Sequence, residues 1–154
     1  MFHQFTPGHE SLDVCPIESG GTRFALRERD VIGVLTLDKD CTLEELGGVL
    51  STWMDDRHRP LVSLRAALCQ PMHPNENVVV MLQIGTQLFG LLVDQAFEPT
   101  RAVVHPTMDP SSPLATFTHM VRLDDGSDVP VLNTTSLALS ARHDAGAPAL
   151  RLAA

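Results

Sequence analysis

Side chains that could hydrolyse a bond occur in this chain, but not in a pattern that hydrolysis requires. A nucleophilic serine needs a base within hydrogen-bonding distance and backbone donors for the developing oxyanion. The chain has no Gly-x-Ser-x-Gly segment, and its one paired serine, Ser111-Ser112, stands between Pro110 and Pro113 in an expected surface loop. We therefore predict no catalytic residues and no enzyme. The side chains from which a triad could be drawn are Ser111, Ser112, His105, His119, Asp94 and Asp109.

Histidine and cysteine, the common zinc ligands, are scattered along the chain. No two of the seven histidines stand three or four residues apart, and there is no Cys-x-x-Cys pair. The three cysteines, Cys15, Cys41 and Cys69, are far apart and odd in number, which is typical of a reducing compartment. We predict no metal and no cofactor, and we interpret the cysteines as small apolar residues rather than reactive thiols.

Neither phosphotransfer nor binding to a phosphate backbone is expected. The two Gly-Gly pairs, at residues 20–21 and 47–48, lack the Lys and the Ser or Thr of a phosphate-binding loop. The 11 Lys and Arg against 19 Asp and Glu leave a net charge of −8, which repels nucleic acid. The most apolar stretch, residues 77–93, is interrupted by Gly and Gln and is too polar for a membrane span. With no export signal at its start, the chain is predicted to be cytoplasmic, without membrane insertion.

The clearest structural element is a hairpin over residues 77–94. The turn Gly85-Thr86 fits a type II′ loop, because glycine accepts a positive φ at the first central position. This turn pairs Ile84 with Gln87 and Leu82 with Phe89, and continues to Val78 opposite Val93. Both faces of the hairpin are then largely apolar, so both must be covered, or one of them docks a partner.

Short apolar runs between Gly, Pro, Asn and Asp predict further strands rather than long helices. We expect one hairpin turning at Gly20-Gly21 and another at residues 124–127, with Pro130 on an edge strand or at a bulge. Residues 42–46 and 64–68 are predicted as short helices, the first from its capping-box spacing. The predicted domain covers residues 12–140, with subdomains at about 12–70 and 77–140 and flexible tails at 1–11 and 141–154.

At this point the chain resembles the CheW-like domain family of bacterial chemosensory systems. The motifs that carry the resemblance are Pro60-Leu61-Val62-Ser63-Leu64-Arg65, then Val78-Val79-Val80-Met81 and Phe89-Gly90-Leu91-Leu92-Val93-Asp94. Phe24-Ala25-Leu26 with Val31-Ile32-Gly33-Val34 is similar to the family's opening strands, and Val103-Val104 and Leu123-Asp124-Asp125-Gly126 to its closing ones. The resemblance covers residues 12–139.

The resemblance implies an all-β fold with two small five-stranded, SH3-like barrels packed side by side and one or two short helices. It implies a non-enzymatic adaptor that links the cytoplasmic tips of methyl-accepting chemoreceptors to a CheA-type histidine kinase of a two-component system. Other CheW-like domains are further expected partners. The seam between the barrels would receive the receptor's helical hairpin, which gives the candidate partner-binding residues Val31, Val34, Leu35, Val103 and Val104.

The turn before Pro60 departs from the family, whose members carry Arg-Gly where this chain has Met54-Asp55-Asp56-Arg57-His58-Arg59. The family's Arg contributes to partner contacts, so the sequence leaves open a CheW-like domain without receptor coupling. A small-molecule-binding β-barrel is the alternative from another functional class. Also open are a stand-alone adaptor and the regulatory domain of a kinase, as the form Pro-Leu-Val-x-Leu-Arg is similar to the latter.

Overall fold

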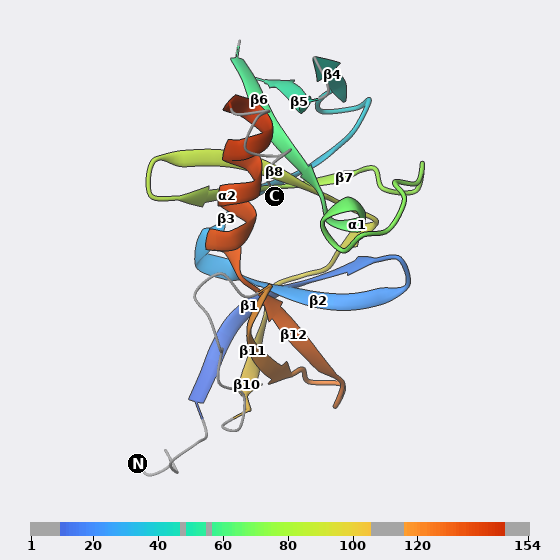
Figure 1. Ribbon diagram of the computed structural model, residues 1–154. Helices are drawn as coiled ribbons and strands as arrows, with labels where there is room; N and C mark the ends of the chain where they lie inside the picture. Colours follow the sequence, from blue (N-terminus) through green and yellow to red (C-terminus); the bar gives the residue numbers. More distant parts are fainter. Residues whose placement is uncertain (1–9, 47–48, 55–56, 106–115, 147–154) are drawn as a thin grey trace.

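The computed structural model describes residues 10–46, 49–54, 57–105 and 116–146, which form two β-sheets with short helices (Figure 1). Sheet A consists of β1 (Glu10–Ser19), β2 (Thr22–Arg27), β9 (Gln95–Ala96), β10 (Thr100–Val104), β11 (Phe117–Arg122) and β12 (Asp128–Leu132). Sheet B consists of β3 (Val31–Thr36), β4 (Glu44–Leu46), β5 (Val49–Met54), β6 (Arg57–Ser63), β7 (Val78–Ile84) and β8 (Gln87–Val93). The helices are the 3-10 turn η2 (Glu28–Asp30), α1 (Leu64–Ala67) and α2 (Thr134–Gly146).

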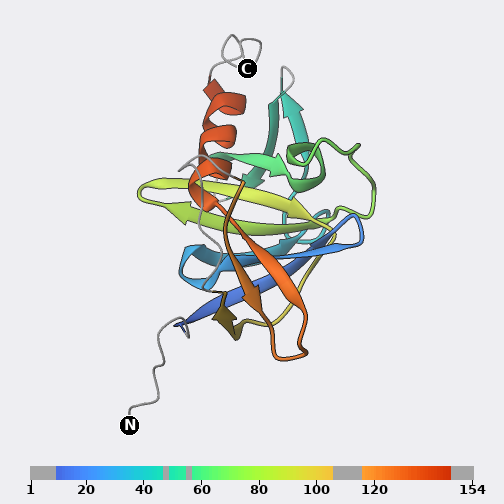
Figure 2. The same cartoon turned by 60° about the horizontal axis from the view of Figure 1, so that its bottom comes forward.

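Sheet A closes into a five-stranded barrel, because β10 pairs with β11 on one side and with β1 on the other. Sheet B runs in the order β3-β7-β8-β6-β5-β4, and its end strands are not paired with each other. The two sheets lie side by side, and α2 crosses sheet B (Figures 1 and 2). The predicted fold class, all-β with two small barrels and few helices, is confirmed; within the described residues only sheet A closes fully.

The division between the sheets differs from the division expected along the chain. Strands β7 and β8 follow residues 70–77 but belong to the same sheet as β3–β6, which precede them. Sheet A joins the first two strands of the chain to the last four. Residues 70–77 thus form a connection inside one sheet. The sequence missed this interleaving because turns and apolar periodicity are local, whereas strand partners are chosen across the whole chain.

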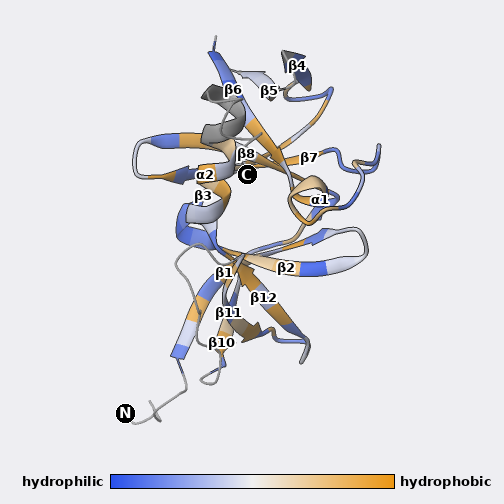
Figure 3. Cartoon of the chain, viewed as in Figure 1, coloured by the Kyte–Doolittle hydropathy of each residue, from blue (hydrophilic) through white to orange (hydrophobic). Residues whose placement is uncertain are grey.

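The β7–β8 hairpin has the predicted register, from Ile84↔Gln87 to Val78↔Val93. Gly85 has a φ of 61°, as the first position of a type II′ turn requires. The inner faces of the strands are divided among three apolar clusters. Figure 3 shows in orange how apolar residues are distributed along the strands. The seam cluster joins the two sheets and α2, and its largest fully buried members are Phe89, Ile17, Leu26, Leu64, Leu82, Leu91 and Leu132. The sheet A cluster contains Val14, Ala25, Ala102, Val121, Leu123, Val129 and Val131. The sheet B cluster contains Cys41, Leu61, Val79, Met81 and Leu92.

Alternation along β7 and β8 therefore sends successive side chains into different clusters. Val80 and Leu91 enter the seam cluster, while Val79 and Leu92 enter the sheet B cluster. The prediction that both apolar faces of the β7–β8 hairpin are covered is confirmed. One face contributes to the sheet B cluster, and the other packs against sheet A and α2. The core that surrounds Leu91 is thus the seam between the sheets rather than the interior of a second barrel.

Several predicted elements are confirmed and others need correction. The hairpins at Gly20-Gly21 and at residues 124–127 are present, and α1 forms where a short helix was predicted. Residues 44–46 form strand β4 rather than a helix, because pairing with β5 overrides the local capping signal. Pro130 is not on an edge: β12 lies between β11 and β2, but pairs with β2 only at Val131↔Ala25.

The ends of the described chain are more ordered than predicted. Strand β1 begins at Glu10, and α2 runs to Gly146, so both elements extend into the segments expected to be tails. Residues 1–9 and 147–154 lie outside the described part of the chain. Leu137, Ala138 and Ala141 attach α2 to the seam cluster. No helix in the described part of the chain has both the length and the apolar character needed to cross a bilayer.

Leu91→Asp tests the seam cluster. Leu91 is fully buried, so an unpaired carboxylate there should destabilise the fold by roughly 4 kcal/mol or more and unfold the protein. Val78→Asp should also destabilise the fold, but by less, because Val78 is only half-buried at the open end of the β7–β8 hairpin. Thermal unfolding followed by circular dichroism gives the comparison, with Gln83→Asp as the exposed control on the same hairpin. A native melting temperature for Leu91→Asp would show that the register is wrong.

Gly90→Ala tests the packing inside sheet B. A Cβ at Gly90 would lie 2.5 Å from Cδ2 of Leu61 and 2.7 Å from Cγ1 of Val79, closer than side chains pack. We expect a loss of about 1–3 kcal/mol from overpacking. Gly33→Ala on the edge strand β3 is the matched control, since a Cβ there meets no atom within 4 Å. Equal unfolding free energies for the two variants in urea would contradict the packing described around Gly90.

Candidate functional site

A β-bulge in β3 turns two valines toward the seam between the sheets. The pairing of β3 with β7 shifts between Val31 and Gly33, so that Val31 lies opposite Leu82 and Val34 opposite Val80. Paired residues point to the same face of a sheet, and Leu82 and Val80 both belong to the seam cluster. Val31 and Val34 therefore both point to the seam face. In a regular strand without a bulge, two residues three positions apart would point to opposite faces. Val31 packs against the cluster, while Val34 remains 53% exposed at the open edge.

The outer surface of β1 and β10 carries another exposed valine and an ion pair. Leu12, Ala102 and Val104 face the interior of the sheet A barrel. The residues between them in sequence therefore point outward. Among these, Val103 is 48% exposed, and Asp13 pairs across the strands with Arg101 at 3.2 Å. This outer face combines an exposed valine with a carboxylate whose charge Arg101 already balances.

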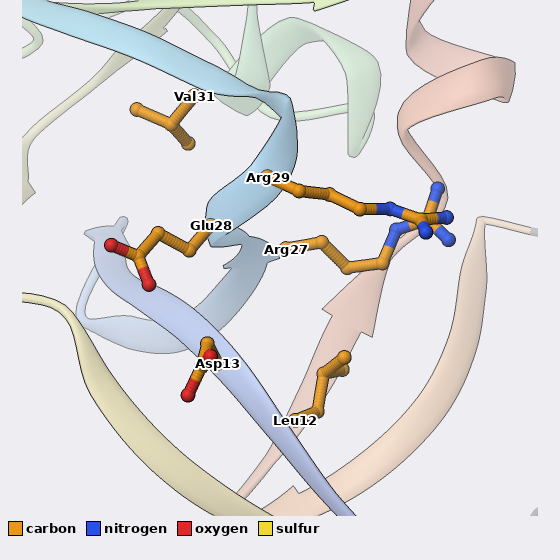
Figure 4. A pocket seen from close by; sticks show the side chains of 6 residues that line it. All are labelled: Leu12, Asp13, Arg27, Glu28, Arg29 and Val31. Carbon is orange, nitrogen blue, oxygen red and sulfur yellow. The ribbon is translucent and has the colours of Figure 1, made fainter.

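A concavity of about 440 Å³ lies where η2 crosses β1. Its lining residues are Leu12, Asp13, Arg27, Glu28, Arg29 and Val31. Asp13, Glu28 and Val31 extend to one side, whereas Arg27 and Arg29 extend away from them (Figure 4). We use the name seam groove for this concavity together with the exposed Val34, which shares a face of β3 with Val31.

Charge is distributed unevenly around the seam groove. Arg27 Nε donates to Asp30 Oδ2 at 3.3 Å, and Arg29 Nε lies 4.0 Å from the other oxygen of the same buried carboxylate. Two arginines thus share the single carboxylate of Asp30, and the Arg29 side chain stays 73% exposed. Glu28 is exposed and forms no hydrogen bond or ion pair within the described residues. The rim of the concavity therefore carries exposed charges of both signs beside Val31.

The five predicted partner-binding residues do not form one exposed surface. Val34 and Val103 are exposed, and Val31 is half-buried against the seam cluster. Leu35 packs against the sheet B cluster and Val104 against the sheet A cluster. Leu35 and Val104 therefore contribute to the core. Partner binding by Val31, Val34 and Val103 stays a prediction.

Sequence reasoning missed two residues at this edge. Ile32, the bulged residue of β3, is 54% exposed. Alternation along the sequence does not show the bulge, so it gave no reason to predict that Ile32 is more exposed than its neighbours. Glu28 was not recognised, because the residues that line a concavity are determined by the fold. The four successive charged residues before the apolar strand, Arg27-Glu28-Arg29-Asp30, were a signal worth following.

A set of hydrogen bonds among Arg65, Asp94 and Gly20 joins the two sheets at another point of the seam, and we call it the clasp. Arg65, in α1, donates from Nε and Nη2 to the two oxygens of Asp94, at 3.1 and 2.6 Å. The same carboxylate accepts the backbone N–H of Gly20, in the β1–β2 turn, at 3.0 Å. Both side chains are largely buried, and the Arg65 hydrogen bonds, opposed by burial and aided by Gly20, hold the pKa of Asp94 below its usual value. The clasp thus ties the end of β8 to sheet A.

Glu76 anchors the 70–77 connection to the same region. Its buried carboxylate accepts hydrogen bonds from the Ser63 hydroxyl, at 2.8 and 2.9 Å, and from the Arg65 N–H at 3.0 Å. Burial raises the pKa of Glu76 against the lowering effect of these hydrogen bonds. Arg65 is therefore held by its backbone to Glu76 and by its side chain to Asp94.

The other chemistry-bearing residues have ordinary structural partners. Burial, with a contribution from Glu28, raises the pKa of the Cys15 thiol to about 11, so this cysteine is protonated at neutral pH. His105 pairs with Asp128 at 2.9 Å, and Asp94 with Arg65, whereas Ser111, Ser112 and Asp109 lie outside the described residues. Within the described residues, no group of three or more His, Cys, Asp and Glu side chains could hold a metal ion.

Asp94→Asn tests the clasp. The neutral amide replaces the ionised partner of Arg65, so we expect the melting temperature at pH 7 to fall by several degrees. Because the folded-state pKa of Asp94 is depressed, the stability from its ionised form is present above the unfolded pKa of about 3.9 and is lost as the pH falls through the folded pKa. The difference between wild type and variant should therefore shrink below pH 3. A constant difference from pH 7 to pH 2.5, measured by calorimetry, would count against this role.

Comparisons with known proteins agree with this arrangement. The family model described as the CheW-like domain matches residues 13–142. The crystal structure of the scaffolding protein TtCheW from Thermoanaerobacter tengcongensis is similar, with a TM-score of 0.58 and 16% sequence identity over 80% of this chain and 89% of that one. At that identity the likeness concerns the fold. A search of curated proteins gave no match. Because the family model covers most of its length, the chain belongs to the CheW-like domain family.

Proposed function

We propose that this protein is a non-enzymatic adaptor in bacterial chemosensory signalling that links chemoreceptors to a CheA-type histidine kinase in the cytoplasm. Membership of the CheW-like family supports the proposal, as does the likeness in fold to the scaffolding protein TtCheW. The observation that carries it is the seam groove, where Val34 stays 53% exposed on the same face of β3 as the half-buried Val31. Its mechanism is the placement of partners rather than chemistry.

The seam groove favours a helical partner over an added strand. The backbone N–H of Thr36, at the end of β3, already donates to Asp40 Oδ2 at 2.9 Å, and its carbonyl accepts from Asp40 N at 2.8 Å. The bulge at Ile32 interrupts the other end of the strand. An incoming strand would need a regular row of free donors and acceptors, which this edge lacks. A helix requires only exposed apolar side chains, so a receptor's helical hairpin is the partner we assign to this edge.

A second surface at the opposite end of sheet B is our candidate for the kinase. Leu43 and Trp53 are 41% and 45% exposed, and Trp53 packs against His58 with ring centroids 4.7 Å apart. Tryptophan is enriched among residues that dominate protein interfaces. Since β3 and β4 are opposite ends of sheet B, the two partners would not compete for one edge. The altered turn at Asp55-Asp56 lies outside the described residues, but β5 and β6 still pair up to Met54↔Arg57.

Titration calorimetry tests the adaptor function directly. The full chain should bind both the regulatory domain of a histidine kinase and the cytoplasmic hairpin of a chemoreceptor from the same cell. We expect micromolar affinities, about −8 kcal/mol each. Val34→Asp should weaken receptor binding by about 10-fold or more while leaving kinase binding and the melting temperature unchanged, because Val34 is exposed.

Met72→Asp is the matched control, since Met72 is 42% exposed on the 70–77 connection and outside the seam groove. Equal loss of receptor affinity in the two variants would remove the groove from the proposal. Absence of binding to either partner by the folded wild type would overturn the adaptor function. The small-molecule alternative would then be tested by a metabolite screen, although seven buried apolar side chains occupy the interior of sheet A.

A further inference from the structure

We propose that Arg65, which lies outside the lining of the concavity, positions the two walls of that concavity for a helical partner. The inference rests on the proposed function and adds a positioning residue to it. The walls belong to different sheets: Leu12 and Asp13 lie on β1 of sheet A, and Val31 lies on β3 of sheet B (Figure 4). A helix that contacts both walls binds most tightly when their relative placement is already fixed.

The two walls meet at a crossover of the chain from sheet A to sheet B. Strand β2 ends at Arg27, and the single turn η2 leads directly into β3. The outermost pair of β1 with β2 is Val14↔Arg27, so Leu12 and Asp13 extend past this crossover. The concavity therefore lies on one side of the crossover, and the β1–β2 turn lies on the other.

The clasp holds the far end of the same β1–β2 hairpin. Gly20 lies in its turn, separated from η2 by the length of β2, about 20 Å at the usual rise of a strand. The Gly20 N–H donates to Asp94 at 3.0 Å, and Arg65, in the helix that follows β6, binds the same carboxylate at 3.1 and 2.6 Å. The hairpin is thus attached to sheet B at both ends. A rotation of the hairpin about η2 would move its turn and the β1 wall of the concavity in opposite directions.

The other contacts at the turn do not prevent this rotation. Asp94 connects β8 to β9 through the backbone, and its N–H donates to the Glu18 carbonyl at 3.0 Å. These bonds keep the turn close to sheet B, but a crossover of one residue can still rotate about its φ and ψ. The seam cluster is apolar, so its contacts are not directional. The guanidinium of Arg65 binds both oxygens of Asp94, and the Arg65 N–H donates to Glu76, so Arg65 fixes the direction.

The Arg65–Asp94 pair is suited to this role because water is largely excluded from it. The two side chains are only 16% and 15% exposed. Without Arg65, the walls of the concavity would sample a range of separations, and a helical partner would have to select one of them. Removal of Arg65 should therefore weaken binding at a site that Arg65 does not touch.

A distance measurement between two spin labels tests the positioning without any partner. Labels at Glu10→Cys on β1 and Val34→Cys on β3 report the separation of the walls, since both positions are exposed. The background variant is Cys69→Ser, because the other two cysteines of the chain are buried. We expect Arg65→Ala to broaden the distance distribution. Arg65→Lys should broaden it less, since lysine keeps the charge but loses the two-point contact.

Met81→Ala is the control for stability. Met81 is buried in the sheet B cluster, away from the seam, so its truncation lowers the melting temperature without loosening the clasp. The distance distribution of this variant should match that of the wild type.

Receptor-hairpin affinity, measured by calorimetry at a temperature where each variant is folded, connects the positioning to function. We expect Arg65→Ala to weaken receptor binding by about 5-fold, and Arg65→Lys by less. Kinase binding should not change, because its candidate surface lies within sheet B. Met81→Ala should bind the receptor hairpin like the wild type.

A wild-type distance distribution in Arg65→Ala would overturn the inference whether or not the receptor hairpin binds. An equal loss of receptor affinity in Arg65→Ala and Met81→Ala would also overturn it, because stability alone would then explain the loss. If Arg65→Ala does not fold, Arg65→Lys takes its place in both comparisons. If the folded wild type binds no hairpin, the proposed receptor coupling fails, and the distance measurement still decides whether Arg65 positions the walls.

Discussion

The β7–β8 hairpin sets the problem that the rest of the structure solves. Its side chains are apolar on both faces, so neither face can meet water without a large loss of hydrophobic stabilisation. Strands β3 and β6 flank it within sheet B, whose interior receives Val79, Met81 and Leu92. Sheet A and α2 cover the other face, which bears Phe89 and Leu91. Gly90 allows this close packing, since any side chain there would collide with Leu61 and Val79.

Covering the second face requires a separate sheet, and this explains the course of the chain. Sheet A closes on itself, so it has an interior cluster of its own and still presents Ile17, Phe24 and Leu26 to the hairpin. Because the seam cluster is apolar and non-directional, it does not by itself fix how the sheets are oriented. The directional contacts come from the Arg65–Asp94 pair and its bond to Gly20. The groove forms at another part of the seam, where β3 ends the sheet.

Local features were predicted from the sequence wherever a turn dictated them. Gly85-Thr86, Gly20-Gly21 and Asp125-Gly126 each fixed a hairpin, and from the first the full register of β7–β8 followed. Features that depend on distant partners were not predicted. Residues 44–46 carry a helical signal but form a strand because they pair with β5. Sheet A combines strands from both ends of the chain, and no local pattern in the sequence predicts that combination.

The candidate site divides in the same way. Val31, Val34 and Val103 were identified as surface candidates through a family resemblance, but alternation could not show that a bulge places Val31 and Val34 on one face. The charges near Glu28 also follow from the fold: Asp13 pairs with Arg101, and Arg27 and Arg29 share the carboxylate of Asp30. No sequence motif shows which of these charges a side chain meets in space.

The clasp bears on how an adaptor of this kind could work. An adaptor without catalytic activity can influence a partner only through the geometry in which it holds it, so the two sheets must keep a defined relation. Arg65 is fixed at its backbone by Glu76 and at its guanidinium by Asp94, which limits the freedom of the joint before any partner arrives. When a groove is already ordered before binding, less of the binding free energy is lost to conformational ordering.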